Sequence, residues 1–167
     1  PVTGIGYNAF SSCKDLTEIV IPQSVTYIGS WAFSSSGLTS IVIPEGVTQI
    51  GENAFHSCGK LVDVTIPSTL TYIGGSAFNY CDGIENVYIS DLKSWCQINF
   101  YSTWSNPLTP AEHLYLDGEL LSGEVTIPDG TTSIGKCVFN TGDITRIYVP
   151  DSVTKIDEFG FYGCSSL

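Results

Sequence analysis

Apolar residues return along this chain with a period of 22 or 23 residues. The dipeptide Ala-Phe occurs at residues 9–10, 32–33, 54–55 and 77–78, and Val138-Phe139 and Gly160-Phe161 continue the series. An isoleucine stands five residues before each of these phenylalanines, at Ile5, Ile28, Ile50, Ile73, Ile134 and Ile156. A fixed period of this length indicates a solenoid of stacked repeats.

Each copy of the repeat predicts two short extended segments followed by a tight turn. Residues 16–21 end in the alternation of a strand, with Ile19 and Ile21 on one face, and Pro22 ends the strand because proline has no backbone N–H. Residues 25–29 form a second extended segment that closes at Gly29. The following Ala-Phe dipeptide is expected in a tight turn or a single helical turn, because no segment has the long 3.6-residue periodicity of a helix.

A single unit of this length cannot bury its own apolar face, so stability must come from stacking. Coils that stack at the strand spacing of about 4.8 Å place each residue above its own copy. The isoleucines then form ladders and the phenylalanines form a spine. Each coil buries about six apolar side chains at roughly 1.5–3 kcal/mol each, against a comparable ordering entropy. Neighbouring coils therefore stabilise one another.

The period fails between Ile89 and Ile127, where 38 residues separate positions that one coil would place about 22 apart. We therefore divide the chain into regular repeats over 1–90, an irregular insert with a hairpin over 91–121, and regular repeats over 122–167, all in one continuous solenoid. Residues 91–100 predict a short helical turn or irregular cover, and Asp117-Gly118 predicts a hairpin turn. Both ends of the chain fall within a repeat, so we expect a piece of a longer protein.

The repeat pattern resembles that of leucine-rich repeat proteins. Its consensus, Leu-x-x-Ile-x-Ile-Pro-x-x-Val-x-x-Ile-Gly-x-x-Ala-Phe-x-x-Cys, resembles the BspA-like subclass in particular, over about residues 1–90 and 122–167. The resemblance implies a repeat solenoid of the leucine-rich-repeat type, in the α/β horseshoe class. This chain departs from ordinary leucine-rich repeats because it lacks their Asn position and has short extended pieces in place of long helices, which makes it strongly β-rich. The resemblance also implies a bacterial protein, secreted or at the cell surface, that adheres to host proteins or to other microbes.

Composition and charge exclude several classes of protein. The net charge is −11 with only six Lys and Arg residues, which disfavours nucleic acid and anionic membrane surfaces as partners. No apolar run approaches the roughly 20 residues of a membrane span, so no membrane insertion is expected in this chain. His56 and His113 stand alone, and no catalytic, phosphate-binding or calcium-binding motif is present. We therefore predict no enzymatic activity and no cofactor.

Six cysteines raise the question of disulfides and zinc. Four of them lie three residues after a repeat phenylalanine, at Cys13, Cys58, Cys81 and Cys164. A small residue at one fixed place in each coil indicates a core position with a free thiol. Cys58 and Cys81 lie in adjacent coils and a disulfide between them stays open, as does a pairing of Cys96 with Cys137. The spacings match no zinc motif, so no metal is expected.

The outward-facing positions of the strands are the expected ligand surface. Two columns follow from the register. One column consists of Glu18, Ser40, Asp63, Asn86, His113, Glu124 and Arg146. The other consists of Val20, Val42, Thr65, Tyr88, Tyr115, Thr126 and Tyr148. Tyrosine is common in strands for purely structural reasons, but the arrangement also predicts a binding patch of Tyr88, Tyr115 and Tyr148 flanked by His113 and Arg146.

Three tryptophans are secondary candidates for binding. Trp95 and Trp104 lie in the insert, where aromatic side chains either cover the core of an irregular coil or bind a sugar or a partner. Trp31 stands at a repeat position held elsewhere by Asn8, Asn53 and Ser76 and is expected to be exposed. The sequence thus favours a recognition or adhesion module for a protein or glycan ligand, with a structural spacer as the alternative. It leaves the oligomeric state open.

Overall fold

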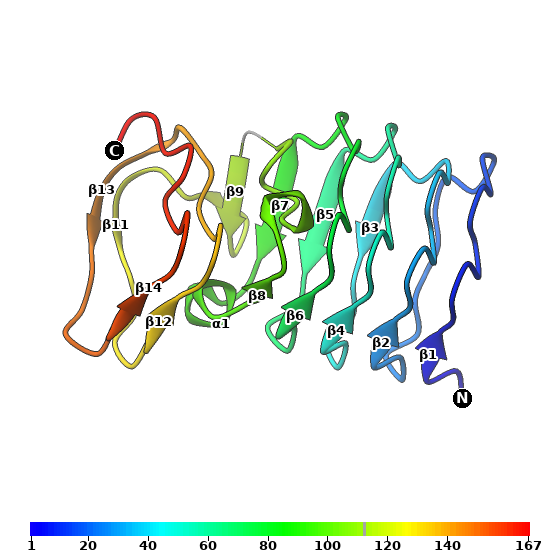
Figure 1. Ribbon diagram of the computed structural model, residues 1–167, viewed down its shortest axis with the longest axis horizontal. Coiled ribbons are helices and arrows are strands. Elements are labelled where there is room, and N and C mark those ends of the chain that lie inside the picture. Colours follow the sequence, from blue (N-terminus) through cyan, green and yellow to red (C-terminus); the bar gives the residue numbers. More distant parts are fainter. Residues whose placement is uncertain (112) are drawn as a thin grey trace.

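The chain winds into a solenoid whose coils follow one another along a single axis (Figure 1). The computed structural model describes residues 1–111 and 113–167. A narrow parallel sheet contains five two-residue strands: β1 (Gly4–Ile5), β2 (Tyr27–Ile28), β4 (Gln49–Ile50), β6 (Tyr72–Ile73) and β8 (Asn99–Phe100). A second five-stranded sheet, here called the face sheet, contains β3 (Ser40–Val42), β5 (Asp63–Ile66), β7 (Asn86–Ile89), β9 (His113–Leu116) and β10 (Glu119–Leu120).

The C-terminal coils form two further pairs of parallel strands. In the first pair β11 (Gly123–Thr126) lies beside β13 (Ile144–Tyr148), and in the second β12 (Ser133–Ile134) lies beside β14 (Lys155–Ile156). The remaining elements are the helix α1 (Leu92–Cys96) and the 3-10 turn η1 (Thr103–Ser105). None of the described helices has the length and apolar character needed to cross a lipid bilayer.

The register places equivalent side chains directly over one another, as the period predicted. Ile28 pairs with Ile50, and Ile50 pairs in turn with Ile73. The phenylalanine rings form the expected spine: the ring centroids of Phe33 and Phe55 lie 5.3 Å apart and the planes differ by 7°. These side chains are fully buried, so successive coils share one elongated apolar core.

The third side of each coil, here called the turn edge, is a run of consecutive tight turns over residues 7–13, 30–36, 52–58 and 75–81. Along it some N–H groups bond within the coil, as Ser34 N does to Trp31 O at 3.2 Å, while alternate ones bond to the next coil, as Phe33 N does to Ala54 O at 2.7 Å. This pattern requires left-handed backbone at two positions per coil, for example at Asn53 (φ +56°) and Ser57 (φ +60°). Backbone hydrogen bonds therefore link neighbouring coils on all three sides.

The insert adapts the solenoid to a coil that lacks the repeat. The Asp91 side chain accepts hydrogen bonds from the N–H groups of Lys93 and Ser94 and so caps α1. The buried Asn106 amide donates to the carbonyls of Cys137, at 2.6 Å, and Val138, at 3.2 Å. In the regular coils the backbone of the Ala-Phe segment bonds to the next coil. The insert has no Ala-Phe dipeptide, and the Asn106 side chain supplies hydrogen bonds to the next coil there.

The hairpin of β9 and β10 interrupts the face sheet. Its turn residues, Asp117 and Gly118, both have positive φ, at +50° and +83°, as a two-residue hairpin requires. β10 pairs antiparallel with β9 and so occupies the edge to which the next parallel strand would bond. β11 consequently pairs with β13 alone, and the two sheets are separate (Figure 1).

Candidate functional site

Two tyrosines of the predicted patch stack on the outer surface of the face sheet. Tyr88 of β7 pairs with Tyr115 of β9, and the ring centroids lie 5.0 Å apart. The Asp63 carboxylate accepts hydrogen bonds from Asn86 Nδ2 at 2.9 Å and from the Tyr88 hydroxyl at 3.5 Å. Desolvation and the nearby Asp63 charge raise the pKa of Tyr88, so this hydroxyl stays protonated and remains a donor.

His113 joins this pair to the C-terminal coils. Its Nδ1 lies 2.9 Å from Asp143 Oδ2, and its ring meets Tyr115 edge-on, with the centroids 6.4 Å apart. Asp143 stands just before β13, so the contact spans the break in the face sheet. Tyr88, Tyr115 and His113 therefore form one cluster, which we call the tyrosine cluster.

Arg146 and Tyr148 lie in a different sheet and form a second cluster. Glu124 accepts hydrogen bonds from Arg146 Nη1 at 2.8 Å and from the Tyr148 hydroxyl at 3.0 Å. Both residues belong to β13, which pairs with β11 and not with the face sheet. The expected continuous row of three tyrosines does not form, because β10 occupies the edge of β9.

A groove runs beside the tyrosine cluster at the proline end of the face-sheet strands. Its volume is about 320 Å³, and Val42, Thr65 and Tyr88 contribute its sheet side. The other lining residues are Gln23, Ile43, Pro44, Glu45, Ile66, Pro67, Ile89, Ser90 and Asp117. Pro44 and Pro67 form one wall of the groove. The recurring Ile-Pro dipeptide marks this wall, because its prolines align when the coils stack, but the outward-facing columns alone did not predict it. The groove is apolar within and carries the carboxylates of Glu45 and Asp117.

The insert tryptophans have opposite surroundings. Trp95 has an exposed fraction of only 1%, and its ring packs edge-on against Phe100 at 5.4 Å, so it covers the core of the irregular coil, the first of its two expected roles, and is closed to a ligand. Both rings fill the core of the irregular coil. Trp95 Nε1 is buried without a hydrogen-bond partner in the described part of the chain. Trp104 has an exposed fraction of 52% and remains available.

Trp31 is half-buried and belongs to a row of rings on the turn edge. Its centroid lies 5.5 Å from that of His56, which lies 5.3 Å from that of Tyr80. Trp31 and Tyr80 both have left-handed backbone, with φ of +60° and +57°. That conformation costs about 1–2 kcal/mol for side chains other than Gly, Asn and Asp, whereas each ring pair returns about 0.5–1.5 kcal/mol. The two contributions are of similar size, and the partial burial of Trp31 adds to the favourable one.

The cysteines are free thiols, each of the six lying within the described residues. Cys81 Sγ donates to Phe55 O at 2.9 Å, and Cys81 and Cys58 are neighbouring free thiols with no disulfide between them. The hydrogen bond with Cys58 and desolvation raise the pKa of Cys81, and burial raises the pKa of Cys96 to about 12. Within residues 1–111 and 113–167, no group of three or more His, Cys, Asp or Glu residues is placed to hold a metal ion.

Thiol reactivity should follow this burial. In the folded chain at pH 8, Ellman's reagent is expected to react readily with the exposed Cys13 and negligibly with Cys96, because a raised pKa leaves almost no thiolate below it. Cys58, Cys81 and Cys137 are also buried and are expected to react only after unfolding in urea. A hydrogen bond with Cys81 lowers the pKa of Cys58 to about 7, so burial of the sulfur, and not a lack of thiolate, protects Cys58. Equal labelling rates for all six thiols without denaturant would contradict this assignment.

The architecture defines the class of protein. Parallel coils of 22 or 23 residues, with aliphatic and phenylalanine columns inside, make a leucine-rich repeat solenoid. The model for the BspA type leucine rich repeat region matches six copies over residues 1–107 and 120–167, so the chain belongs to this family. No curated protein has significant sequence similarity to it.

Solved structures share the fold at low sequence identity. A leucine-rich repeat protein from Bacteroides ovatus matches 99% of this chain with a TM-score of 0.50 and 21% identity, over 57% of its own length. The T. pallidum leucine rich repeat protein has the same TM-score and identity, over 100% of this chain and 72% of its own. A leucine-rich repeat protein from Eubacterium ventriosum matches 96% of this chain and 49% of its own length, with a TM-score of 0.51 and 19% identity. The chain thus spans little more than half of the first of these proteins.

Proposed function

We propose that this chain is a recognition module of a secreted or surface-exposed bacterial protein, and that the tyrosine cluster with its groove binds a protein or glycan ligand. The observation that carries the proposal is the stacked pair of Tyr88 and Tyr115 beside an apolar groove of about 320 Å³. Aromatic rings beside an apolar hollow are typical of binding hot spots. The BspA-type family supports the extracellular location. We assign the module no chemical reaction.

The charges around the groove favour a partner that is not acidic. Glu45 and Asp117 line it, and no Lys or Arg does. The Asp63 carboxylate lies beneath Tyr88 on the same surface. The chain as a whole carries a net charge of −11, which repels a polyanionic ligand, attracts a basic one and leaves a neutral one unaffected.

The test is a binding screen of the purified chain against arrayed host matrix proteins and glycans, followed by substitution of the tyrosines. Tyr88→Ser with Tyr115→Ser is expected to weaken binding of any captured ligand at least tenfold, about 1.4 kcal/mol, with an unchanged far-UV circular dichroism spectrum. Adding Tyr148→Ser should change little more, because Tyr148 lies in a separate sheet. Tyr27→Ser, on the narrow sheet, is the matched control.

Two outcomes would count against the proposal. Unchanged capture by the double variant would remove the tyrosine cluster from the binding surface. If the intact chain captured nothing across the screen, the alternative would be favoured, in which the solenoid is a spacer that holds other parts of a longer protein apart.

A further inference from the structure

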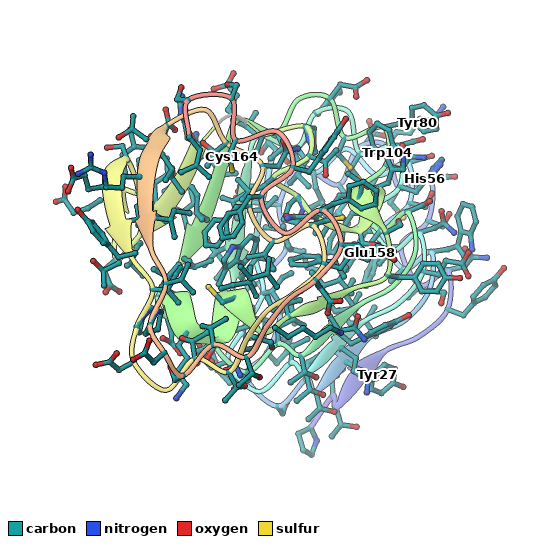
Figure 2. The ribbon with its side chains drawn as sticks, turned by 60° about the vertical axis from the view of Figure 1, so that its left-hand side comes forward. Tyr27, His56, Tyr80, Trp104, Glu158 and Cys164 are labelled. Carbon is teal, nitrogen blue, oxygen red and sulfur yellow. The ribbon has the colours of Figure 1, made fainter. Side chains whose placement is uncertain are left out.

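The row of Trp31, His56 and Tyr80, here called the aromatic row, lies on the turn edge and not on the face sheet. Figure 2 shows His56, Tyr80 and Trp104 gathered on one side of the molecule. Trp104 belongs to the next coil, because its carbonyl accepts a hydrogen bond from Phe78 N at 3.1 Å. The exposed fractions of Tyr80 and Trp104 are 61% and 52%, so their rings are open to solvent.

Other copies of the repeat form the same turn with different side chains. At the position of Trp31 they have Asn8, Asn53, Ser76, Cys137 and Phe159, all with positive φ, and asparagine adopts this backbone most readily. At the position of Tyr80, the three preceding copies have serine, at Ser12, Ser35 and Ser57. Two aromatic residues thus replace smaller residues at strained backbone positions of the same edge. Strain of this kind is an observation from which a functional role is inferred.

A hollow of about 280 Å³, lined by Lys, Ser and Gly residues, adjoins the row. Lys14 and Lys60 line it together with Ser35, Ser36, Gly37, Ser57 and Gly59. It arises because Ser36-Gly37-Leu38 is one residue shorter than the matching segments that begin at Cys13 and Cys58. The Ser57 hydroxyl lies 2.9 Å from His56 Nδ1, so the row and the hollow meet at these two residues.

We propose that the aromatic row and the adjoining hollow bind a neutral oligosaccharide. A pyranose ring presents an apolar C–H face, which packs against an aromatic ring, and hydroxyl groups at its edge, which need hydrogen-bond partners. The aromatic row offers rings for the C–H face. The ammonium group of Lys14 and the hydroxyl groups of Ser35 and Ser57 offer hydrogen-bond partners for the sugar hydroxyls. The net charge of −11 opposes a polyanionic glycan.

A glycan fits this edge better than a folded protein does. The row is one side chain wide per coil, whereas a stable protein interface buries about 800 Å² on each partner. The site lies on a different side of the coil from the tyrosine cluster, so it is independent of the function proposed above.

The test is isothermal titration calorimetry of the whole chain with cellohexaose, maltohexaose and the hexamer of N-acetylglucosamine. Saturable binding of at least one of these sugars is expected. Trp31→Asn and Tyr80→Ser restore residues that the repeat uses elsewhere, and each is expected to weaken binding at least tenfold. Neither should lower the midpoint of thermal unfolding, because both remove a bulky side chain from left-handed backbone.

Tyr88→Ser with Tyr115→Ser is the matched control, since it removes two rings from the face sheet and should leave sugar binding unchanged. The inference is overturned if none of the three sugars binds or if Trp31→Asn binds as tightly as the unaltered chain. It is also overturned if the face-sheet variant loses sugar binding instead. A lower thermal midpoint with unchanged binding would assign the row a structural role.

Discussion

Phe55→Ala is expected to lower the free energy of unfolding by about 3–5 kcal/mol, the range for deletion of a fully buried aromatic ring. Phe55 has no exposed surface, and its ring stacks between Phe33 at 5.3 Å and Phe78 at 5.1 Å. The backbone bonds between neighbouring coils hold their spacing, so the cavity cannot collapse fully. Urea unfolding followed by circular dichroism measures the loss.

Phe10 and Tyr7 provide the graded controls for this prediction. Phe10 is only partly buried and its ring stacks on Phe33 alone, so Phe10→Ala should cost clearly less. Tyr7 is 70% exposed, and Tyr7→Ala should change stability by less than about 0.5 kcal/mol. Equal losses for Phe10→Ala and Phe55→Ala would show that the spine is not the source of stability.

Gly51→Ala is expected to cost about 3 kcal/mol, at the upper end of the range for overpacking. A methyl group at this position would lie 2.4 Å from the backbone nitrogen of Ser30 in the neighbouring coil. The contact cannot relax by a side-chain rotation, because Gly51 N also donates to Ile28 O at 2.8 Å and fixes the spacing of the coils. The midpoint of thermal unfolding should fall accordingly.

Gly59→Ala is the matched control for this substitution. Gly59 has no neighbouring atom within 4 Å of the added methyl group and lies in the same repeat. Its replacement should be neutral or stabilising by less than about 1 kcal/mol, through the lower entropy of the unfolded chain. Similar losses at Gly51 and Gly59 would contradict the close approach of the coils.

The period predicted most of the fold because each side chain packs on its own copy. Once Phe33 and Phe55 are recognised as equivalent, their contact follows without further information. The left-handed backbone at the turn edge could also have been predicted from the sequence, since asparagine, as at Asn8 and Asn53, favours that conformation. The repeat pattern predicted the turn there, but its left-handed backbone was not predicted.

The binding surface was less predictable because it depends on which strands pair. The columns correctly placed Tyr88 beside Tyr115, but they also continued to Tyr148. Asp117-Gly118 predicts the hairpin of β9 and β10, but only the folded arrangement shows that β10 then occupies the edge of β9 and excludes β11. Core cover was one of the two roles expected for Trp95, and packing decided between them because the insert has no counterpart in the repeat.

The hairpin of β9 and β10 also affects how the solenoid unfolds. Among the described residues, the strand ladder of the face sheet ends at β10, and β11 begins a new one with β13. Between them the junction includes discrete bonds such as Gly135 N to Cys96 O and Asn106 to the carbonyls of Cys137 and Val138. The stability of a solenoid depends on the interfaces between neighbouring coils, so we expect the last coils to unfold before the first five when this junction is weakened.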